Sequence, residues 1–300
     1  MTTAGLGCGG HSRLGIAARG FAHACSLVRH AYEHGVRFFD TSAAYGTQSA
    51  VGEGLAGIRR DKVIISTKFP YSRGGALRPA KDLAEEVDSS LRELKTDYID
   101  LYHLHGVMPE DYPAVRDRFY PEMLKMKEAG KIRFPGITER FFADTRHDML
   151  RAALADDLWD VVMTGYNLLN PSAAKTILPA AEARQVGVLC MFAVRKSLSD
   201  PGQLEADIRK MLQAGQADPE MVPIQGALDF LAEEGHAASI PEAAYRFCRH
   251  TPGIHVTLTG TGNAEHLDEN LRSLAGPPLP QAVLKRLEAM FGRVDCVSGQ

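Results

Sequence analysis

Short apolar segments rich in β-branched residues alternate with helical patterns along almost the whole chain. Eight of these segments are predicted to be buried strands: Leu6–Cys8, Val36–Phe39, Val63–Ser66, Tyr98–Leu104, Ile132–Phe134, Val161–Met163, Val186–Met191 and Val256–Leu258. The intervening segments place apolar residues at helical spacing, as at Leu83, Val87, Leu91 and Leu94. Strands that alternate with helices predict βαβ units and a parallel sheet, and eight such strands close a barrel. We therefore expect an α/β fold, a (β/α)8 TIM barrel.

The length of 300 residues suggests two domains at about 150 residues each, but one barrel of about 250 residues with additions also accounts for it. Two segments exceed the barrel pattern: a long connection at about 195–223 and a C-terminal extension at about 276–300. Each contains a helical pattern, at Leu204–Leu212 and Ala282–Phe291. We expect a single domain over 1–300, with substrate choice decided in these two additions, because long βα connections are usually functional.

Composition and charge exclude several classes of protein. The chain has 34 basic and 37 acidic residues, a net charge of −3, which does not favour a nucleic acid or an anionic membrane as partner. No apolar run approaches the length of about 18 residues that a membrane span needs, and the start has no signal-peptide pattern. The five scattered cysteines form no C-x-x-C motif, and most are predicted to be buried small hydrophobes in a reducing compartment. These features predict a cytoplasmic protein.

Four polar residues follow three neighbouring predicted strands. Asp40 and Tyr45 follow the second strand, Lys68 ends the third, and His105 ends the fourth. In a barrel the C-terminal ends of the strands form one rim, where functional residues gather. A tyrosine, whose ordinary pKa is about 10, donates a proton more readily when a nearby ammonium lowers that pKa. We therefore expect Tyr45 to be a general acid beside Lys68, with Asp40 orienting the lysine and His105 orienting a carbonyl or sharing the proton.

Five motifs stand in order along the chain: Asp40-Thr41-x-x-x-Tyr45-Gly46, Thr67-Lys68, Asp97-Tyr98-Ile99-Asp100-Leu101-Tyr102-x-x-His105, Gly130-Lys131-Ile132-Arg133 and the run Gly260–Asn270. Together they look like the motifs of the aldo-keto reductase family, from about Gly5 to Asn270. The resemblance implies a barrel that binds NADP(H) and interconverts an alcohol with the carbonyl of an aldehyde, ketone or sugar by hydride transfer. It also implies a catalytic tetrad, which matches Asp40, Tyr45, Lys68 and His105, with Tyr45 as proton donor.

The resemblance further implies a set of cofactor contacts: Thr138, Glu139, Tyr166, Met191, Gly260, Thr261, Gly262, Asn263, His266, Glu269 and Asn270. The turn Gly260–Asn263 matches the family's adenosine-phosphate loop, at the start of a helix whose N–H groups can hold phosphate. The family's Gly-Val-Ser-Asn reads Gly136-Ile137-Thr138-Glu139 here, so the nicotinamide must be held differently. The arginine that often favours the 2′-phosphate is replaced by His266, so NADP is the predicted cofactor and NAD the alternative.

The run Gly5-Leu6-Gly7-Cys8-Gly9-Gly10 formally matches the G-x-G-x-x-G pattern of a Rossmann dinucleotide site. That site needs a strand before the glycines and a helix after them. Only four residues precede Gly5, and the residues after Gly10 are a poor helix start. These glycines are instead expected to end the first barrel strand and to permit close approach of a ligand.

Two histidine pairs have spacings that metal sites use. His103-x-His105 resembles the ligands of metal-dependent barrel hydrolases, but the later strand ends lack the further ligands that such a site needs. His30-x-x-x-His34 has helical spacing without the glutamate of H-E-x-x-H, and we interpret it as a solvated helix end. No metal is predicted.

A non-catalytic function remains the alternative, because some relatives in this family are cofactor-sensing subunits of channels. The altered nicotinamide contacts are compatible with such a subunit, whereas the four intact tetrad positions favour turnover. Arg195, at the start of the long connection, is expected to contact the cofactor phosphates, an anionic substrate or a helix end.

Overall fold

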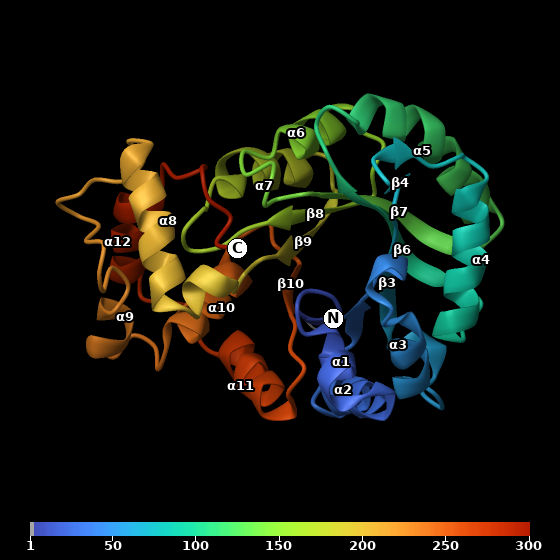
Figure 1. Cartoon of the computed structure of the whole chain (residues 1–300), viewed down its shortest axis with the longest axis horizontal. Coiled ribbons are helices and arrows are strands. Elements are labelled where there is room, and N and C mark those ends of the chain that lie inside the picture. Colours follow the sequence, from blue (N-terminus) through green and yellow to red (C-terminus); the bar gives the residue numbers. More distant parts are fainter. Residues whose placement is uncertain (1–2) are drawn as a thin grey trace.

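A computed structural model describes residues 3–300 and shows a closed barrel of eight parallel strands (Figure 1). The strands are β1 (Ala4–Gly7), β2 (Phe38–Asp40), β3 (Ile64–Phe69), β6 (Ile99–Val107), β7 (Ile132–Glu139), β8 (Val161–Gly165), β9 (Gly187–Met191) and β10 (Val256–Thr259). They follow one another around the barrel in sequence order, and β1 closes it by pairing with both β2 and β10. The prediction of a (β/α)8 barrel is confirmed, with strand ends shifted by a few residues.

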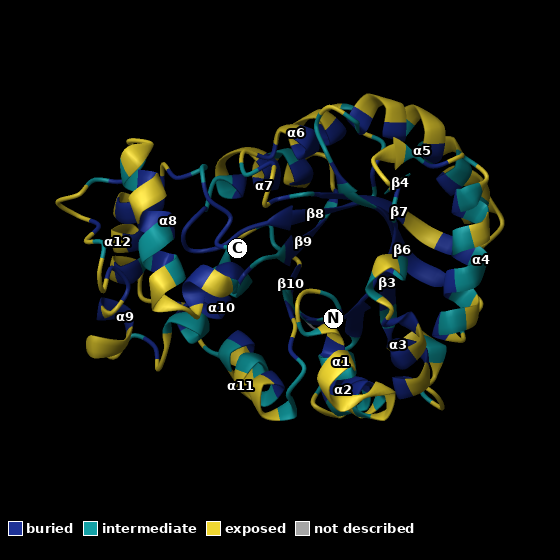
Figure 2. Ribbon diagram, in the orientation of Figure 1, coloured by how far each residue is buried: buried dark blue, intermediate teal, exposed yellow. Residues whose placement is uncertain are grey.

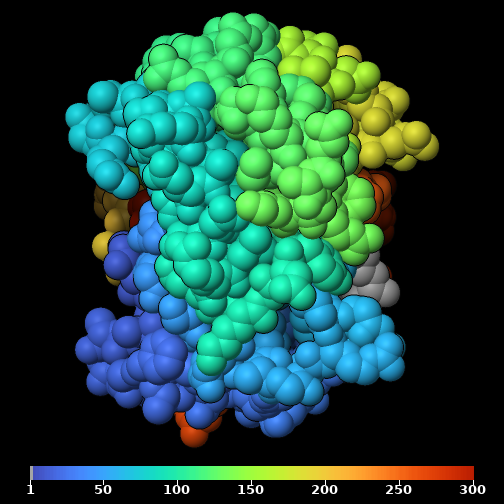
Figure 3. Space-filling model, turned by 90° about the vertical axis from the view of Figure 1, so that its right-hand side faces the viewer, coloured from blue at the N-terminus to red at the C-terminus, as the bar shows by residue number. Residues whose placement is uncertain are grey.

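The barrel strands are surrounded by helices, which follow them along the chain. The helices around the barrel are α1 (Ile16–Arg19), α2 (Phe21–Glu33), α3 (Gln48–Gly54), α4 (Asp82–Leu94), α5 (Tyr112–Glu128), α6 (Asp148–Ala155), α7 (Ala173–Ala183), α10 (Ile240–His250) and α11 (Ala264–Ala275). The apolar periodicity explains how they dock: α4 buries Leu83, Val87 and Leu94 on one face. Figure 2 shows the opposite faces exposed, and Figure 3 shows the surface that α4 and α5 form on one side.

A short hairpin of β4 (Ser72–Arg73) and β5 (Ala76–Leu77) follows β3 and was not predicted.

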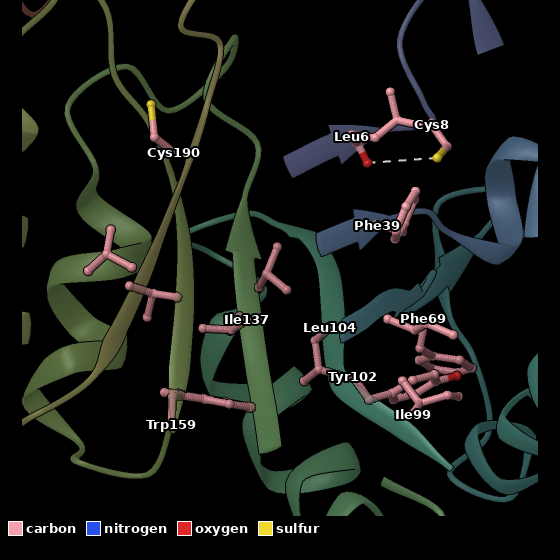
Figure 4. Close-up of a cluster of buried hydrophobic side chains, with 14 of the residues drawn as sticks. Leu6, Cys8, Phe39, Phe69, Ile99, Tyr102, Leu104, Ile137, Trp159 and Cys190 are labelled. Atoms are coloured by element: carbon pink, nitrogen blue, oxygen red, sulfur yellow. Dashed lines mark hydrogen bonds between the residues drawn. The ribbon is translucent and has the colours of Figure 1, made fainter. Parts of the chain in front are cut away.

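The largest hydrophobic core fills the layer between the strands and the helices. It includes Leu6, Phe39, Tyr102 and Ile137, which Figure 4 shows among the strands. Burying each such side chain contributes about 1.5–3 kcal/mol to the free energy of unfolding. This core holds the strands at fixed positions and thus the residues at their ends.

A second, smaller core fills the interior of the barrel. Its residues point inward from alternate positions of the strands, and they are Phe38, Leu101, Val161, Met163, Leu189 and Val256. Because side chains alternate along a strand, Asp40 follows Phe38 on the inward face, and His103 and His105 follow Leu101. The strands therefore present apolar residues on the barrel floor and polar residues toward the C-terminal rim.

The long connection after β9 and the C-terminal extension pack against each other as a helical side lobe. Its helices are α8 (Pro201–Gln213), α9 (Phe230–Glu233) and α12 (Gln281–Phe291) (Figure 1). Side chains from these helices form a hydrophobic core separate from the barrel layer, with Ile208, Leu231 and Leu287 among its members. The sequence predicted the two main helices but not their shared core. A single domain over 1–300 stays a prediction.

The glycine-rich start of the chain belongs to the barrel and not to a Rossmann fold. The first barrel strand, predicted at Leu6–Cys8, is found at Ala4–Gly7, and a short helix, α1, follows. That strand lies between β2 and β10 in a closed barrel, whereas a Rossmann strand lies in an open sheet. The Rossmann alternative is therefore excluded.

The cysteines lie mostly where the sequence suggests. Cys8, Cys190 and Cys248 are buried, and all five thiols are free. Cys25 is only partly buried, because it lies at the edge of the inward face of α2. Within residues 3–300, no helix is long and apolar enough to cross a membrane.

Candidate active site

A cavity of about 710 Å³ opens at the C-terminal ends of β1, β2, β8, β9 and β10. Eight of the predicted site residues line it: Asp40, Tyr45, Met191, Gly260, Thr261, His266, Glu269 and Asn270. Its wall thus joins the polar end of β2 to the turn between β10 and α11. A smaller cavity of about 420 Å³, beside α3 and β3, contains none of the predicted residues.

Asp40 and Lys68 form a buried ion pair at the floor of this cavity. Lys68 is 1 % exposed, and its ammonium lies 2.7 and 2.6 Å from the two carboxylate oxygens of Asp40. It also donates to the carbonyl oxygen of Thr41 at 2.7 Å, and Ser66 Oγ donates to Asp40 at 2.7 Å. Burial lowers the pKa of Lys68, but the charge and hydrogen bonds of Asp40, together with Tyr45 and Cys8, outweigh burial, so the pKa of Lys68 is raised. The lysine is therefore a fixed positive charge.

The phenol of Tyr45 lies against His105 at 3.2 Å from Nε2. On the other side of the ring, His105 Nδ1 lies 3.1 Å from Ser42 Oγ. This hydroxyl also accepts from the N–H of Ala44 and lies 3.5 Å from the carbonyl oxygen of Lys68. With Nδ1 turned to Ser42, Nε2 faces the Tyr45 hydroxyl. Burial lowers the pKa of His105 to about 3, which keeps the ring neutral.

Ser42 was not predicted, although it lies within the motif that contains Asp40 and Tyr45. It holds the His105 ring through a contact across 63 positions of sequence. Only the fold brings the two residues together. The sequence shows only that a serine lies between the two candidate catalytic residues Asp40 and Tyr45.

The expected lowering of the Tyr45 pKa is wrong for this arrangement. Burial raises the pKa of Tyr45 above its ordinary value of 10.0, and the opposing effect of Lys68 is smaller. The Lys68 ammonium lies 5.2 Å from the centroid of the tyrosine ring, but it is paired with Asp40, whose carboxylate offsets its charge. Desolvation of the phenol, which the sequence does not reveal, outweighs the charge of Lys68.

Seven predicted site residues do not line the cavity: Lys68 and His105 of the tetrad, and the cofactor contacts Thr138, Glu139, Tyr166, Gly262 and Asn263. The hydroxyl of Thr138 accepts from the backbone N–H of Gly106 at 2.7 Å. Tyr166 is buried and stacks on Phe247, with ring centroids 5.4 Å apart. Their side chains have partners within the protein, and their contact with the cofactor stays a prediction.

Glu139 belongs to a buried polar cluster beside the barrel. It is 2 % exposed and accepts from the backbone N–H of Gly165 at 2.7 Å and from His147 Nδ1 at 2.9 Å. Ser172 lies 3.0 Å from His147 Nε2, in the order serine, histidine, carboxylate. The Ser172 hydroxyl donates to Asn170 Oδ1, so its proton is not directed at His147 Nε2 as a serine nucleophile would need. The cluster lies buried and away from the cavity wall.

The turn between β10 and α11 forms the other end of the cavity. Gly260 has no space for a side chain, since a Cβ there would lie 2.7 Å from the carbonyl oxygen of Gly7. Asn263 caps α11 by accepting from the N–H of Glu265, and Gly262 bonds through its carbonyl to His23. These last two predicted residues lie behind the cavity wall. The N-terminus of α11 nonetheless presents the positive end of its dipole near Gly260 and Thr261.

The pair His30 and His34 is not simply solvated, as the sequence suggested. His30 Nε2 lies 2.6 Å from Asp268 Oδ1, which ties α2 to α11. His34 is exposed and bonds to the carbonyl of His30. The contact between His30 and Asp268 holds α11, which borders the cavity, against α2.

His103 lies on the inward strand face beneath His105 and has no hydrogen-bond partner on either ring nitrogen within residues 3–300. Burial lowers its pKa well below 6.5, so the ring is neutral. An unsatisfied buried polar group costs about 1–3 kcal/mol. We therefore expect His103→Leu to raise the free energy of unfolding, by about 1 kcal/mol, in urea denaturation. A clear loss of stability would show that His103 has a partner, such as a buried water.

Comparison with known proteins agrees with this architecture. The sequence profile of the Aldo/keto reductase family matches residues 7–291. The aldo-keto reductase YhdN of Bacillus subtilis is 29% identical over 262 residues, which are 81% of this chain and 76% of that protein.

Two solved structures share the fold. The holo form of aldo-keto reductase AKR11C1 from Bacillus halodurans has a TM-score of 0.70 and 21% identity, covering 95% of this chain and 91% of that one. An aldo-keto reductase from Klebsiella pneumoniae in complex with NADPH has a TM-score of 0.68 and 21% identity, covering 100% and 95%.

Fold and family profile together define the class of protein as an NAD(P)-dependent barrel oxidoreductase. The chain belongs to the aldo/keto reductase family.

Proposed function

We propose that the chain reduces an aldehyde, ketone or sugar carbonyl with NADPH, with Tyr45 as the proton donor. The observation that carries the proposal is the contact of the Tyr45 hydroxyl with neutral His105, above the ion pair of Lys68 and Asp40, on one wall of the cavity. The far wall supplies the glycine turn before α11, which suits the phosphates of a dinucleotide. A cytoplasmic location and a small-molecule substrate, without nucleic acid or membrane, belong to the same proposal.

Each residue of the tetrad has a distinct part in this chemistry. Bound NADPH would supply a hydride to the carbonyl carbon. Tyr45 donates its proton to the carbonyl oxygen, and the fixed charge of Lys68 stabilises the phenolate that forms. His105, which lies between Ser42 and Tyr45, fixes the position of the Tyr45 oxygen, and its Nε2 is the neighbour from which the hydroxyl proton must be free when it passes to the carbonyl oxygen. Asp40 keeps Lys68 in place.

The cavity also bears on the choice of cofactor. His266, Glu269 and Asn270 line it beside α11 and would lie near the adenosine. The NADPH complex of the Klebsiella pneumoniae protein supports NADP, and NAD remains the alternative because His266 stands where an arginine is common. Binding titrations with both reduced cofactors should show the tighter dissociation constant for NADPH.

The proposal is tested by following NADPH and NADH oxidation with a panel of aldehydes, ketones and sugars. Turnover of at least one carbonyl class, with stoichiometric alcohol formation, is the expected result. Tight cofactor binding without turnover on the whole panel would contradict the proposal and favour a cofactor-sensing subunit.

The pH dependence of carbonyl reduction follows from the two shifted pKa values. Reduction needs protonated Tyr45, whose pKa is raised above 10.0, while that of His105 is lowered to about 3. Neither group changes its charge near neutrality, so kcat/KM should be flat from about pH 5.5 to about pH 9 and should fall only as the pH rises further. A fall in kcat/KM that begins near pH 7 would show that Lys68 lowers the pKa of Tyr45 by more than burial raises it.

A further inference from the structure

Arg195 lies on the cavity wall just after β9 and has no acidic partner within the described residues 3–300. Its Nε donates to the side-chain oxygen of Gln300 at 2.8 Å, and Nη2 donates to the same atom. A guanidinium has five N–H groups, so three remain without an acceptor among residues 3–300, two of them on Nη1. A partly buried cation that is held by a neutral amide is available for an anionic ligand.

The guanidinium is held in place by a strained residue. Phe192 has a φ of 67°, in the left-handed region that a bulky side chain rarely adopts. Its ring lies 4.1 Å from the centre of the Arg195 guanidinium and packs edge-on against Phe141. Its carbonyl accepts from Asn167 Nδ2 at 3.2 Å. Such strain persists where the surroundings enforce it, and it gathers at ligand sites.

The free edge of Arg195 lies near Tyr45. A Cβ at Gly9 would lie 2.5 Å from the ring of Tyr45, and one at Gly10 would lie 3.5 Å from Nη1 of Arg195. The phenol and the guanidinium therefore flank two consecutive residues of one loop. Burial lowers the pKa of Arg195, as expected for a cation without a counter-ion.

The acidic residues around this part of the cavity provide no counter-ion for the Arg195 guanidinium. Of the acidic residues on the wall, Asp40 is paired with Lys68, and Glu242 lies 2.9 Å from Arg246. Glu269 belongs to α11, at the opposite end. His11, which also lines the cavity, bonds to Gln300 at 3.1 Å and not to an acid. Positive charge thus faces the phenol.

We propose that Arg195 binds the carboxylate of the carbonyl substrate, so that the enzyme prefers aldehydes or ketones that carry a carboxylate. The proposal rests on the proposed function. Nη1 and the free N–H of Nη2 form a two-pronged edge, which suits a carboxylate geometrically. Gln300 is a positioning residue, since it fixes the rotation of the guanidinium. The cofactor diphosphate is the competing anion, and the experiment separates the two.

The test compares 4-oxobutanoate with its neutral methyl ester in wild type and in Arg195→Gln. We expect the variant to lose kcat/KM for the acid by about 10- to 100-fold, as for a lost hydrogen bond to a charged group, and for the ester by less than about threefold. The dissociation constant of NADPH should change by less than about threefold. Gln300→Ala should show a smaller loss in the same direction, and Arg184→Gln, at an exposed arginine on α7's C-terminal end, should show none.

Three results would overturn the proposal. Equal losses for acid and ester would show that Arg195 does not recognise the carboxylate, and a weaker NADPH affinity with an unchanged acid-to-ester ratio would assign Arg195 to the cofactor. Calorimetric binding of succinate to the enzyme with NADP+ gives a readout that needs no turnover. Succinate binding that Arg195→Gln leaves unchanged would also reject the proposal. If no carbonyl is turned over but succinate binds through Arg195, the proposed function fails and the anion site stands.

Discussion

Tyr45→Phe is expected to reduce the rate of carbonyl reduction by about 10²- to 10⁴-fold, the contribution typical of a general acid. The phenol oxygen is the atom that contacts His105, and no other hydroxyl in the described structure bonds to that Nε2. Removing it takes away the proton donor while the aromatic ring still packs against Gly9. NADPH affinity should stay within about twofold, because the change removes no charge. Steady-state kinetics and a fluorescence titration of NADPH measure the two effects.

The matched control is Tyr120→Phe, which removes the same atom from a tyrosine on α5 that packs against Trp159. It should leave kcat/KM within about twofold of wild type. Near-wild-type turnover in Tyr45→Phe would refute the assignment of the proton donor. Equal losses in both variants would point to a general effect on folding.

Of the substitutions considered, Lys68→Met should lower the free energy of unfolding most, because it leaves the buried carboxylate of Asp40 without its cation. Breaking one side of a buried ion pair costs about 3–5 kcal/mol. Asp40 is 4 % exposed and would retain Ser66 Oγ as a donor, which compensates only in part. Urea denaturation should show this loss in the free energy of unfolding, together with the loss of carbonyl reduction.

The double variant Asp40→Asn with Lys68→Met separates stability from chemistry. Replacing both charges removes the unpaired carboxylate, so most of the lost stability should return. Carbonyl reduction should stay low, because the fixed charge beside Tyr45 is gone. A double variant as unstable as Lys68→Met would show that packing, and not the unpaired charge, causes the loss. Recovery of turnover would show that Lys68 is not needed for catalysis.

The barrel and its polar rim were predictable because both depend on local patterns. Buried strands leave apolar runs in the sequence, and parallel strands bring their C-terminal ends to one rim wherever the loops go. This is why Asp40 and Lys68, 28 positions apart, could be placed together before the structure was known. The structure adds the distances and the buried state of the pair.

Other features depend on contacts that no local pattern reveals. Glu139 occupies a strand end, but His147 holds it in a buried cluster away from the cavity. The helices of the side lobe were visible singly, whereas their common core joins segments about 75 residues apart, as between Ile208 and Val283. The raised pKa of Tyr45 depends on desolvation, which requires knowledge of the surrounding atoms.

The most direct test of the proposed reaction follows the hydride itself. NADPH deuterated at the transferable position of the nicotinamide is mixed with a carbonyl that the enzyme accepts, and the alcohol is analysed by mass spectrometry. Wild type should place one deuterium on the former carbonyl carbon, and Tyr45→Phe should do so at least about 100-fold more slowly with its cofactor still bound. Alcohol without deuterium, or equal rates of label transfer in the two proteins, would contradict the account.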